Sequence, residues 1–338
     1  GRDEMVYWSE NHYLMFSAAG YLAGHLYPSE TFSNAGKKGT EVSAAARPRV
    51  LRWLGERLRY GFSEWNSPVY YPHDVAPLLN LIDFAPDEEI VRKASSVLDL
   101  LLFDLARFTQ KGSFGTTAGR IYPEHKFSGH RQSIGNLIEI LFGTRGSFRG
   151  RGSTAAMSFA TSRRYRVPHA LLGIGRDSSA RIIDRSRVSL SFDEAPAAGI
   201  GFRSLEDGMS WWTRGAYLAP ETIALSRRMV QTWGLDHMSY FRPFSYFSFL
   251  SDASLAALSG LFGPLSKGSV LSRAEIYSFR TPDGMLSSVQ DYRKGQVGYQ
   301  QHAWQATFDL DAVVFTTQPA PLGRKGPGEW TGSASMPR

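Results

Sequence analysis

The first part of the chain carries hydrophobic residues at the three- and four-residue spacing of amphipathic helices. The longest stripe begins after Pro86-Asp87-Glu88-Glu89, whose acids stand where a helix dipole favours negative charge. It comprises Ile90, Val91, Ala94, Val97, Leu98, Leu101, Leu105 and Phe108. Shorter stripes predict helices over 13–26, 50–58, 75–84 and 133–142. Loops rich in Gly, Pro and Asn separate them, which indicates stacked antiparallel helical hairpins.

The second part of the chain changes to the two-residue period of strands. Over 302–310, one face would carry His302, Trp304, Ala306, Phe308 and Leu310, and the other face Gln305, Thr307 and Asp309. This alternation predicts a half-buried strand that has His302 at the beginning of its apolar face. Further strands are predicted over 188–192, 199–202, 209–213 and 273–279, separated by turns rich in Gly and Pro.

The predicted helices all precede the predicted strands along the chain. This order predicts an α+β chain of two domains rather than a βαβ fold. We place the boundary in the Arg-, Ser- and Gly-rich region over 165–185. The division is then a helical-hairpin domain over 1–170 and an antiparallel, sandwich-like β domain over 171–338. The chain starts at Gly1 without a Met, and its last residues form a polar tail. We therefore expect both domains to be parts of a longer protein.

Composition narrows the class of protein. Of 338 residues, 42% are hydrophobic and 20% are charged, as in globular proteins. The absence of cysteine excludes disulfides, thiolate metal ligands and a cysteine nucleophile. No stretch of about 18 apolar residues predicts a membrane span. The net charge of +7 favours anionic partners. Scattered arginines without a zinc-finger spacing or a long basic tail argue against nucleic acid, and the charge alone does not choose between membrane lipid and an acidic polysaccharide.

The segment WSENHYLMF, residues 8–16, places Glu10, Asn11 and His12 at the start of an apolar helix. Ser9 is suited to cap that helix by accepting a backbone N–H. The next three residues are proton-handling or hydrogen-bonding groups and are a candidate site. The alternative interpretation is an ordinary helix start without chemistry.

A second cluster occupies the segment GFSEWNSPVYYPHD, residues 61–74. A leading glycine and two prolines indicate a rigid loop between helices, and rigid loops commonly carry functional residues. The candidates in this loop are Glu64, Asn66, Tyr70, Tyr71 and His73. The alternative is a well-packed aromatic loop in which His73-Asp74 caps the following helix.

Two further patches are candidates. Arg120 and Tyr122 follow the run GTTAG, and an arginine there could bind a carboxylate. The run lacks the Lys-Ser/Thr ending of a phosphate-binding loop. In the strand part, Tyr299, Gln301, His302 and Trp304 cluster at the start of a predicted strand. The alternative for the Arg120 patch is a flexible loop between helices. The alternative for His302 is a histidine of the core. The sequence has no HExxH motif, no histidine pair with ligand spacing and no Gly-x-Ser-x-Gly elbow. It therefore predicts neither a metal site nor a serine nucleophile.

Two features together suggest a family. Helical hairpins precede a β domain, and Asn11-His12 is followed by Ser67-Pro68-Val69-Tyr70. This arrangement resembles the heparinase II/III and alginate lyase group of polysaccharide lyases, which combine an (α/α) toroid with a β-sheet domain. The chain also resembles a bacterial family with SENH and EW-x-S-x-x-Y motifs, the latter seen here as Glu64 to Tyr70.

The resemblance implies β-elimination of a uronate-containing polysaccharide without a cofactor. Asn11 and His12 would neutralise the uronate carboxylate, Tyr70 would donate the proton, and His302 would complete the site from the β domain. The expected substrate-binding residues are Glu10, Glu64, Asn66, Tyr71, His73, Arg120, Tyr122, Tyr299, Gln301 and Trp304. An extracellular substrate would imply a secreted or periplasmic protein. The oligomeric state stays open.

Three departures keep other functions open. Fewer hairpins fit before the strands than a full toroid needs, so the toroid would be incomplete. The Arg-Thr that commonly precedes the Ser-x-x-Tyr is replaced here, and Glu64 would stand unfavourably beside a uronate. A glycoside hydrolase on the related (α/α) six-hairpin scaffold would use Glu10 and Glu64 as its carboxylate pair, with Asp74 in reserve. A glycan-binding protein without catalysis is the third hypothesis.

Overall fold

A computed structural model describes residues 5–148, 153–179, 181–266, 271–292 and 301–316. In these ranges the chain forms twelve α-helices and one five-stranded antiparallel sheet, besides two small two-stranded hairpins. The α+β class is therefore confirmed. No helix in the same ranges is both long enough and apolar enough to cross a membrane.

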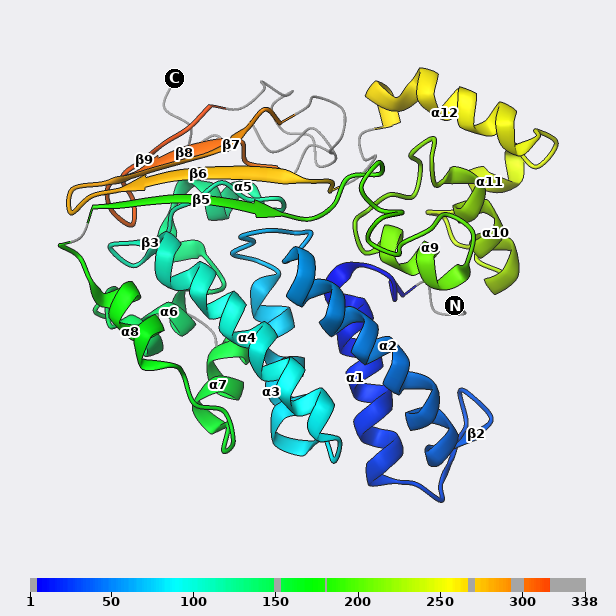
Figure 1. Ribbon diagram of the computed structural model, residues 1–338, viewed down its shortest axis with the longest axis horizontal. Helices are drawn as coiled ribbons and strands as arrows, with labels where there is room; N and C mark the ends of the chain where they lie inside the picture. The colour runs from blue at the N-terminus through cyan, green and yellow to red at the C-terminus, as the bar shows by residue number, and fades with distance from the viewer. Residues whose placement is uncertain (1–4, 149–152, 180, 267–270, 293–300, 317–338) are drawn as a thin grey trace.

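Four long helices form two consecutive hairpins, of which α3 and α4 lie below the sheet and α1 and α2 lie beside them (Figure 1). They are α1 (Glu10–Leu26), α2 (Gly39–Tyr60), α3 (Tyr71–Phe84) and α4 (Glu88–Phe108). The small hairpin of β1 (Thr31–Phe32) and β2 (Lys37–Lys38) joins the first pair. The Asp87 side chain caps α4 by accepting the Glu89 N–H at 2.8 Å. All four of these helices were predicted from their hydrophobic stripes.

Shorter elements extend this helical layer. They are β3 (Thr109–Gln110), β4 (Ser113–Phe114), α5 (Pro123–Phe127), the 3₁₀ turn Gly129–Arg131, α6 (Gly135–Phe142), α7 (Thr154–Thr161) and α8 (His169–Arg176). Helix α7 packs against α3, and α8 packs against α4. The predicted helix over 133–142 is confirmed as α6.

The sheet lies over the helices with its strands in the order β5-β6-β7-β8-β9 (Figure 1). The strands are β5 (Ile182–Val188), β6 (Ala274–Arg280), β7 (Met285–Gln290), β8 (Trp304–Thr307) and β9 (Val313–Val314). Every pair is antiparallel. The strand predicted over 273–279 is confirmed. The strand predicted over 188–192 is wrong, because β5 ends at Val188 and the chain leaves the sheet at Ser189, whose φ is 62°.

A helical lobe, residues 189–266, is inserted between β5 and β6. It contains α9 (Leu205–Trp212), α10 (Ile223–Trp233), α11 (Pro243–Tyr246) and α12 (Asp252–Ser266). The strand predicted over 209–213 is wrong, since 209–212 form the end of α9 and Thr213 is its C-cap. A capping box between Ser204 and Asp207 starts that helix. The strand predicted over 199–202 is also absent from the described lobe.

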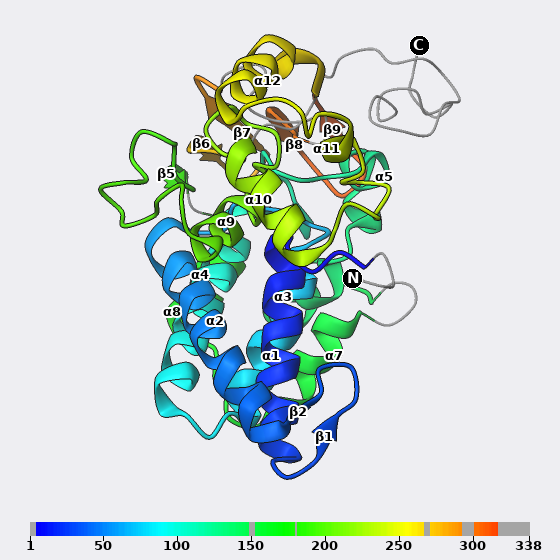
Figure 2. The same cartoon turned by 90° about the vertical axis from the view of Figure 1, so that its right-hand side faces the viewer.

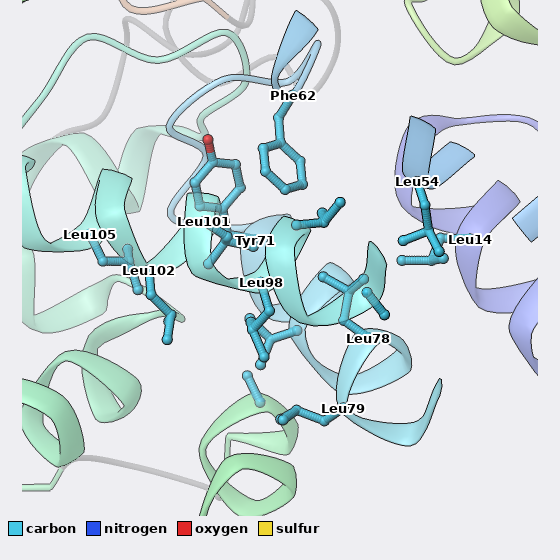
Figure 3. Packing of buried hydrophobic residues seen from close by; sticks show 14 of the residues in the cluster. Leu14, Leu54, Phe62, Tyr71, Leu78, Leu79, Leu98, Leu101, Leu102 and Leu105 are labelled. Atoms are coloured by element: carbon cyan, nitrogen blue, oxygen red, sulfur yellow. The ribbon is translucent and has the colours of Figure 1, made fainter. Parts of the chain in front are cut away.

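Two hydrophobic cores correspond to the helical layer and the lobe. Side chains of α1 to α4 interdigitate in the first core, where Figure 3 shows Leu14, Leu54, Leu78 and Leu98. It continues into the sheet through Ile276 and Val289. The second core centres on Trp211, Trp212, Met229 and Phe241. Trp8, just before α1, belongs to this second core, and Figure 2 shows the start of α1 beside the lobe.

The inner face of the sheet, which covers the helical layer, is polar at its centre. Gln305 and Thr307 are buried there, whereas Phe308 is 48% exposed. The prediction for 302–310 therefore had the correct period and the wrong face for β8. The reason is a layer of hydrogen bonds: Gln305 donates to Thr307 at 2.8 Å, and Thr307 donates to the Gly115 carbonyl at 3.1 Å. Satisfied polar groups can be buried at little cost.

Candidate active site

The site is built around the buried carboxylate of Glu10, at the first position of α1. One oxygen accepts hydrogen bonds from the Arg57 guanidinium and, at 2.8 Å each, from the N–H and hydroxyl of Ser63. The other oxygen accepts the Glu64 N–H at 2.8 Å. Glu10 thus fixes the loop over 61–70 against α1 and α2. Its oxygens are occupied, which leaves it poorly suited to act on a substrate.

Ser67 explains the spacing of the Ser-x-x-Tyr motif. Its hydroxyl accepts the Tyr70 N–H at 3.1 Å and donates to the Arg120 carbonyl at 2.7 Å. One side chain therefore shapes the turn before α3 and ties it to the segment over 115–122. Tyr70 and Arg120 are brought together in this way although they are distant in the sequence.

The contact between Trp65 and Gly119 sets the position of Arg120. The Gly119 N–H donates to the Trp65 carbonyl at 2.8 Å. A Cβ at residue 119 would lie 2.5 Å from the Trp65 ring, so only glycine fits. With the chain held so close, the Arg120 Nε lies 2.9 Å from the Glu64 Oε1. The arginine predicted to bind a carboxylate thus meets Glu64 in this structure.

The Glu64 carboxyl has a pKa close to neutrality. Its side chain is buried, and burial raises its pKa to about 7, with Arg120 opposing and Glu10 adding to the shift. Its Oε2 has no hydrogen-bond partner in the described part of the chain. Asp74, also buried, has its pKa raised by burial and then by the charges of Glu10 and Glu64. Protonating Glu64 would release the charge of Arg120 toward another anion.

Two phenols lie beside this ion pair. The hydroxyls of Tyr70 and Tyr122 are 2.6 Å apart, and the Arg120 guanidinium lies 5.7 Å from the centre of the Tyr70 ring. Burial raises the pKa of Tyr70 well above its usual value, and the Glu64 charge and the Tyr122 hydrogen bond raise it further. Tyr70 therefore keeps its proton through the physiological range and is suited to donate it.

His12 and His73 complete this cluster from α1 and α3. Burial, followed by the charge of His73, lowers the pKa of His12, and burial lowers the pKa of His73. The Ser9 hydroxyl donates to Asn11 Oδ1 at 2.8 Å and lies 2.6 Å from His12 Nδ1. Because its one proton goes to Asn11, Ser9 accepts from Nδ1–H, which leaves His12 Nε2 as the basic atom. The His73 ring is 6.0 Å from that of Tyr70.

Other residues predicted for the site have structural partners. The Tyr71 hydroxyl donates to Asp104 at 2.8 Å and accepts the Asn66 N–H at 2.9 Å; Figure 3 shows Tyr71 beside Phe62 at one end of the core. The Asn66 amide donates to Thr116 at 3.3 Å. These contacts hold the loop rather than present a group to a ligand.

The predicted residues of the sheet lie in different surroundings. The buried His302 ring pairs with Gln305 at 2.8 Å, packs on Phe315, and has its pKa lowered to about 3 by burial and then by Lys126. Gln301 donates to the Gly119 carbonyl at 3.0 Å, so it touches the site backbone. Trp304 bonds Thr316 at 2.8 Å. Tyr299 lies outside the described residues. The described contacts of the His302 ring do not include the tyrosine pair.

The lobe supplies a residue that the sequence did not indicate. Burial raises the pKa of Tyr217; the charges of Tyr240 and Glu64 add to the shift, and the Arg120 charge and a hydrogen bond from Trp8 oppose it, so Tyr217 lies within reach of the ion pair. The site thus combines α1, α3, two loops and the inserted lobe. Within the described ranges, no group of three or more His, Asp or Glu side chains could hold a metal ion.

Comparison of the chain with protein-family models, curated proteins and solved structures found no match. Glu64, Arg120, Tyr70 and Tyr122 lie together in the structure, and His73 links His12 to Tyr70.

Proposed function

We propose that this protein cleaves a uronate-containing polysaccharide by β-elimination, as a polysaccharide lyase of the heparinase II/III and alginate lyase type. The proposal includes the architecture, in which the hairpins α1–α2 and α3–α4 are part of an incomplete (α/α) toroid and the sheet belongs to a second domain. The observation that carries the proposal is the Tyr70–Tyr122 hydroxyl pair at 2.6 Å beside the guanidinium of Arg120.

The elimination requires a base that has lost its proton and an acid that still holds one. His12 Nε2, neutral because its pKa is lowered, takes the proton from the carbon next to the uronate carboxylate. The electron pair of the broken carbon–hydrogen bond forms a carbon–carbon double bond, and the bond between carbon 4 and the 4-oxygen breaks. Tyr70, which holds its proton, gives it to the departing oxygen. Return of a proton from the imidazolium to the phenolate restores both groups.

The uronate carboxylate needs donors, since the developing charge makes the adjacent proton hard to remove. Arg120 is the donor beside the tyrosine pair, and the resemblance adds the Asn11 amide as a second; preorganised donors of this kind are worth several kcal/mol, roughly 3 or 4 each. The ion pair with Glu64 holds Arg120 in place before substrate arrives. With a pKa of about 7, Glu64 is readily neutralised, which removes the conflict with a bound uronate.

The first test is ultraviolet absorbance of the purified protein incubated with a panel of uronate polysaccharides. New absorbance from an unsaturated uronate that Tyr70→Phe abolishes would support the proposal. Circular dichroism of Tyr70→Phe should match the wild type, so that a loss of turnover is not a loss of fold. A matched control is Tyr246→Phe, which removes the same atom from a side chain that is 63% exposed on the lobe.

One observation favours hydrolysis as a second candidate. Glu64 is buried, has a pKa of about 7 and carries an oxygen that has no hydrogen-bond partner within the described ranges, which are the properties of a general acid. Because Glu10 is occupied by Arg57 and the loop, the second carboxylate would be Asp74. New reducing ends without ultraviolet absorbance, lost in Glu64→Gln and kept in Tyr70→Phe, would establish this reaction. Saturable binding without either product would identify a glycan-binding protein.

A further inference from the structure

The helical lobe is fixed directly to the loop that carries Glu64. The Ser63 hydroxyl lies 3.4 Å from the Thr213 carbonyl, and the next residue, Arg214, pairs with Glu56 of α2 at 3.0 Å. Gly215 then takes a positive φ of 72°, which turns the chain sharply after α9. Tyr217 follows this turn. Its place beside the site is therefore determined by contacts with the helical layer, and does not depend on the lobe alone.

An exposed aromatic ring continues outward from Tyr217. The rings of Tyr217 and Tyr240 are 5.6 Å apart and nearly perpendicular, at 85°. Tyr240 is 60% exposed, whereas Tyr217 is partly buried. Phe241 supports both rings, at 6.2 Å from Tyr217 and 4.9 Å from Tyr240. The two tyrosines thus lead from the Arg120–Glu64 pair to solvent, and the second core of the protein holds them in place.

We infer that Tyr217 and Tyr240 form an aromatic subsite that binds the sugar ring next to the reacting one. An aromatic face covers the C–H face of a sugar, and a phenol hydroxyl can bond to sugar hydroxyls at its edge. A ring held by the hydrophobic core loses little freedom on binding, so its contact contributes to affinity. The inference rests on the proposed function for the identity of the reacting ring, but the binding of a saccharide can be measured without turnover.

The test compares Tyr240→Ala, Tyr240→Trp and Tyr246→Ala by affinity electrophoresis and calorimetry. The probes are an oligouronate and neutral oligosaccharides of the same length. Tyr240→Ala should weaken binding about fivefold to tenfold, the loss expected of one stacked ring. Tyr240→Trp, which keeps an aromatic face, should restore it. Tyr246, 63% exposed on the same lobe, is the matched control, and its replacement should leave affinity at the wild-type value.

The outcomes separate this inference from the proposed function. Wild-type affinity in Tyr240→Ala would overturn the subsite even if the elimination product appears. Tyr240-dependent binding of neutral glycans alone, with no unsaturated product, would sustain the subsite and refute the lyase. Where turnover is seen, the loss in Tyr240→Ala should appear mainly in KM, as for a residue that does not touch the reacting atoms. Equal losses in Tyr240→Ala and Tyr246→Ala would overturn the inference.

Discussion

The Glu64 carboxylate lies 2.9 Å from the Arg120 guanidinium, and its second oxygen is buried without a hydrogen-bond partner among the residues that the structure describes. The pair makes the charge of the site depend on pH near neutrality. Below a pH of about 7, Glu64 is protonated and Arg120 contributes a net positive charge; above it, the pair is neutral.

Affinity for an anionic sugar should therefore fall as the pH rises through about 7. In Glu64→Gln the side chain cannot ionise, so the affinity should change much less over the same range. Calorimetric titration of an oligouronate between pH 5.5 and 8.5, roughly one and a half units on either side of that pKa, measures this difference. A parallel fall in both proteins would show that another group controls binding.

Glu10 should be essential for folding rather than for chemistry. Glu10→Ala leaves the Arg57 guanidinium buried without its carboxylate, which should lower the free energy of unfolding by about 3–5 kcal/mol. Urea denaturation measures the loss. Glu30→Ala, at an exposed position after α1, is the control and should stay within about 0.5 kcal/mol of the wild type. A Glu10→Ala protein of unchanged stability and no turnover would instead make Glu10 catalytic.

Gly119 should not tolerate a side chain. Gly119→Ala places a Cβ 2.5 Å from the buried Trp65 ring, and the adjustment should cost about 1–3 kcal/mol and displace Arg120. The matched control is Gly55→Ala within α2, where a Cβ meets nothing within 4 Å. That change should stabilise the protein by about 0.5–1 kcal/mol, because alanine favours a helix interior. Thermal unfolding of the two variants should thus shift in opposite directions.

His12 should determine the acidic limb of the activity profile. A base must be unprotonated, and the pKa of His12 is lowered from its ordinary value by burial and then by His73. We expect the midpoint of the rising limb of kcat/KM to lie below pH 6.5, the ordinary value for histidine, and the loss of affinity caused by Glu64 to lower kcat/KM again above about pH 7. His12→Gln should reduce kcat about 10²- to 10⁴-fold and remove that limb. An unchanged limb in His12→Gln would assign the base to another group.

The helical layer could be predicted because its signals are local. The stripe of α4 and the Asp87 cap specify the same helix, and tertiary packing agrees with both. The prediction of a strand over 209–213 was wrong because the local signal is weak. Five residues are too few to separate a strand from the last turn of a helix, and the deciding signal was the upstream pair Ser204 and Asp207.

Only some residues of the site could be predicted from the sequence. Glu64, Tyr70 and Arg120 were found because their residue types are suited to the chemistry. The roles of Glu10 and Tyr71 depend on partners distant in the sequence, Arg57 and Asp104, which no spacing indicates. Gln305 and Thr307 were placed on the wrong face because the polar layer that accepts them comes from a separate loop. Tyr217 was missed because the lobe was expected to be strands.

The insertion of the lobe between β5 and β6 has a consequence for the order of folding. Strands β6 and β7 are joined by a tight turn and can pair early, whereas Val188 meets Ala274 only after the chain of the whole lobe has been brought back to its start. Closing so long a loop is entropically costly and slows the pairing. We therefore expect β5 to join the sheet last, in a slow kinetic phase that a prefolded lobe would shorten.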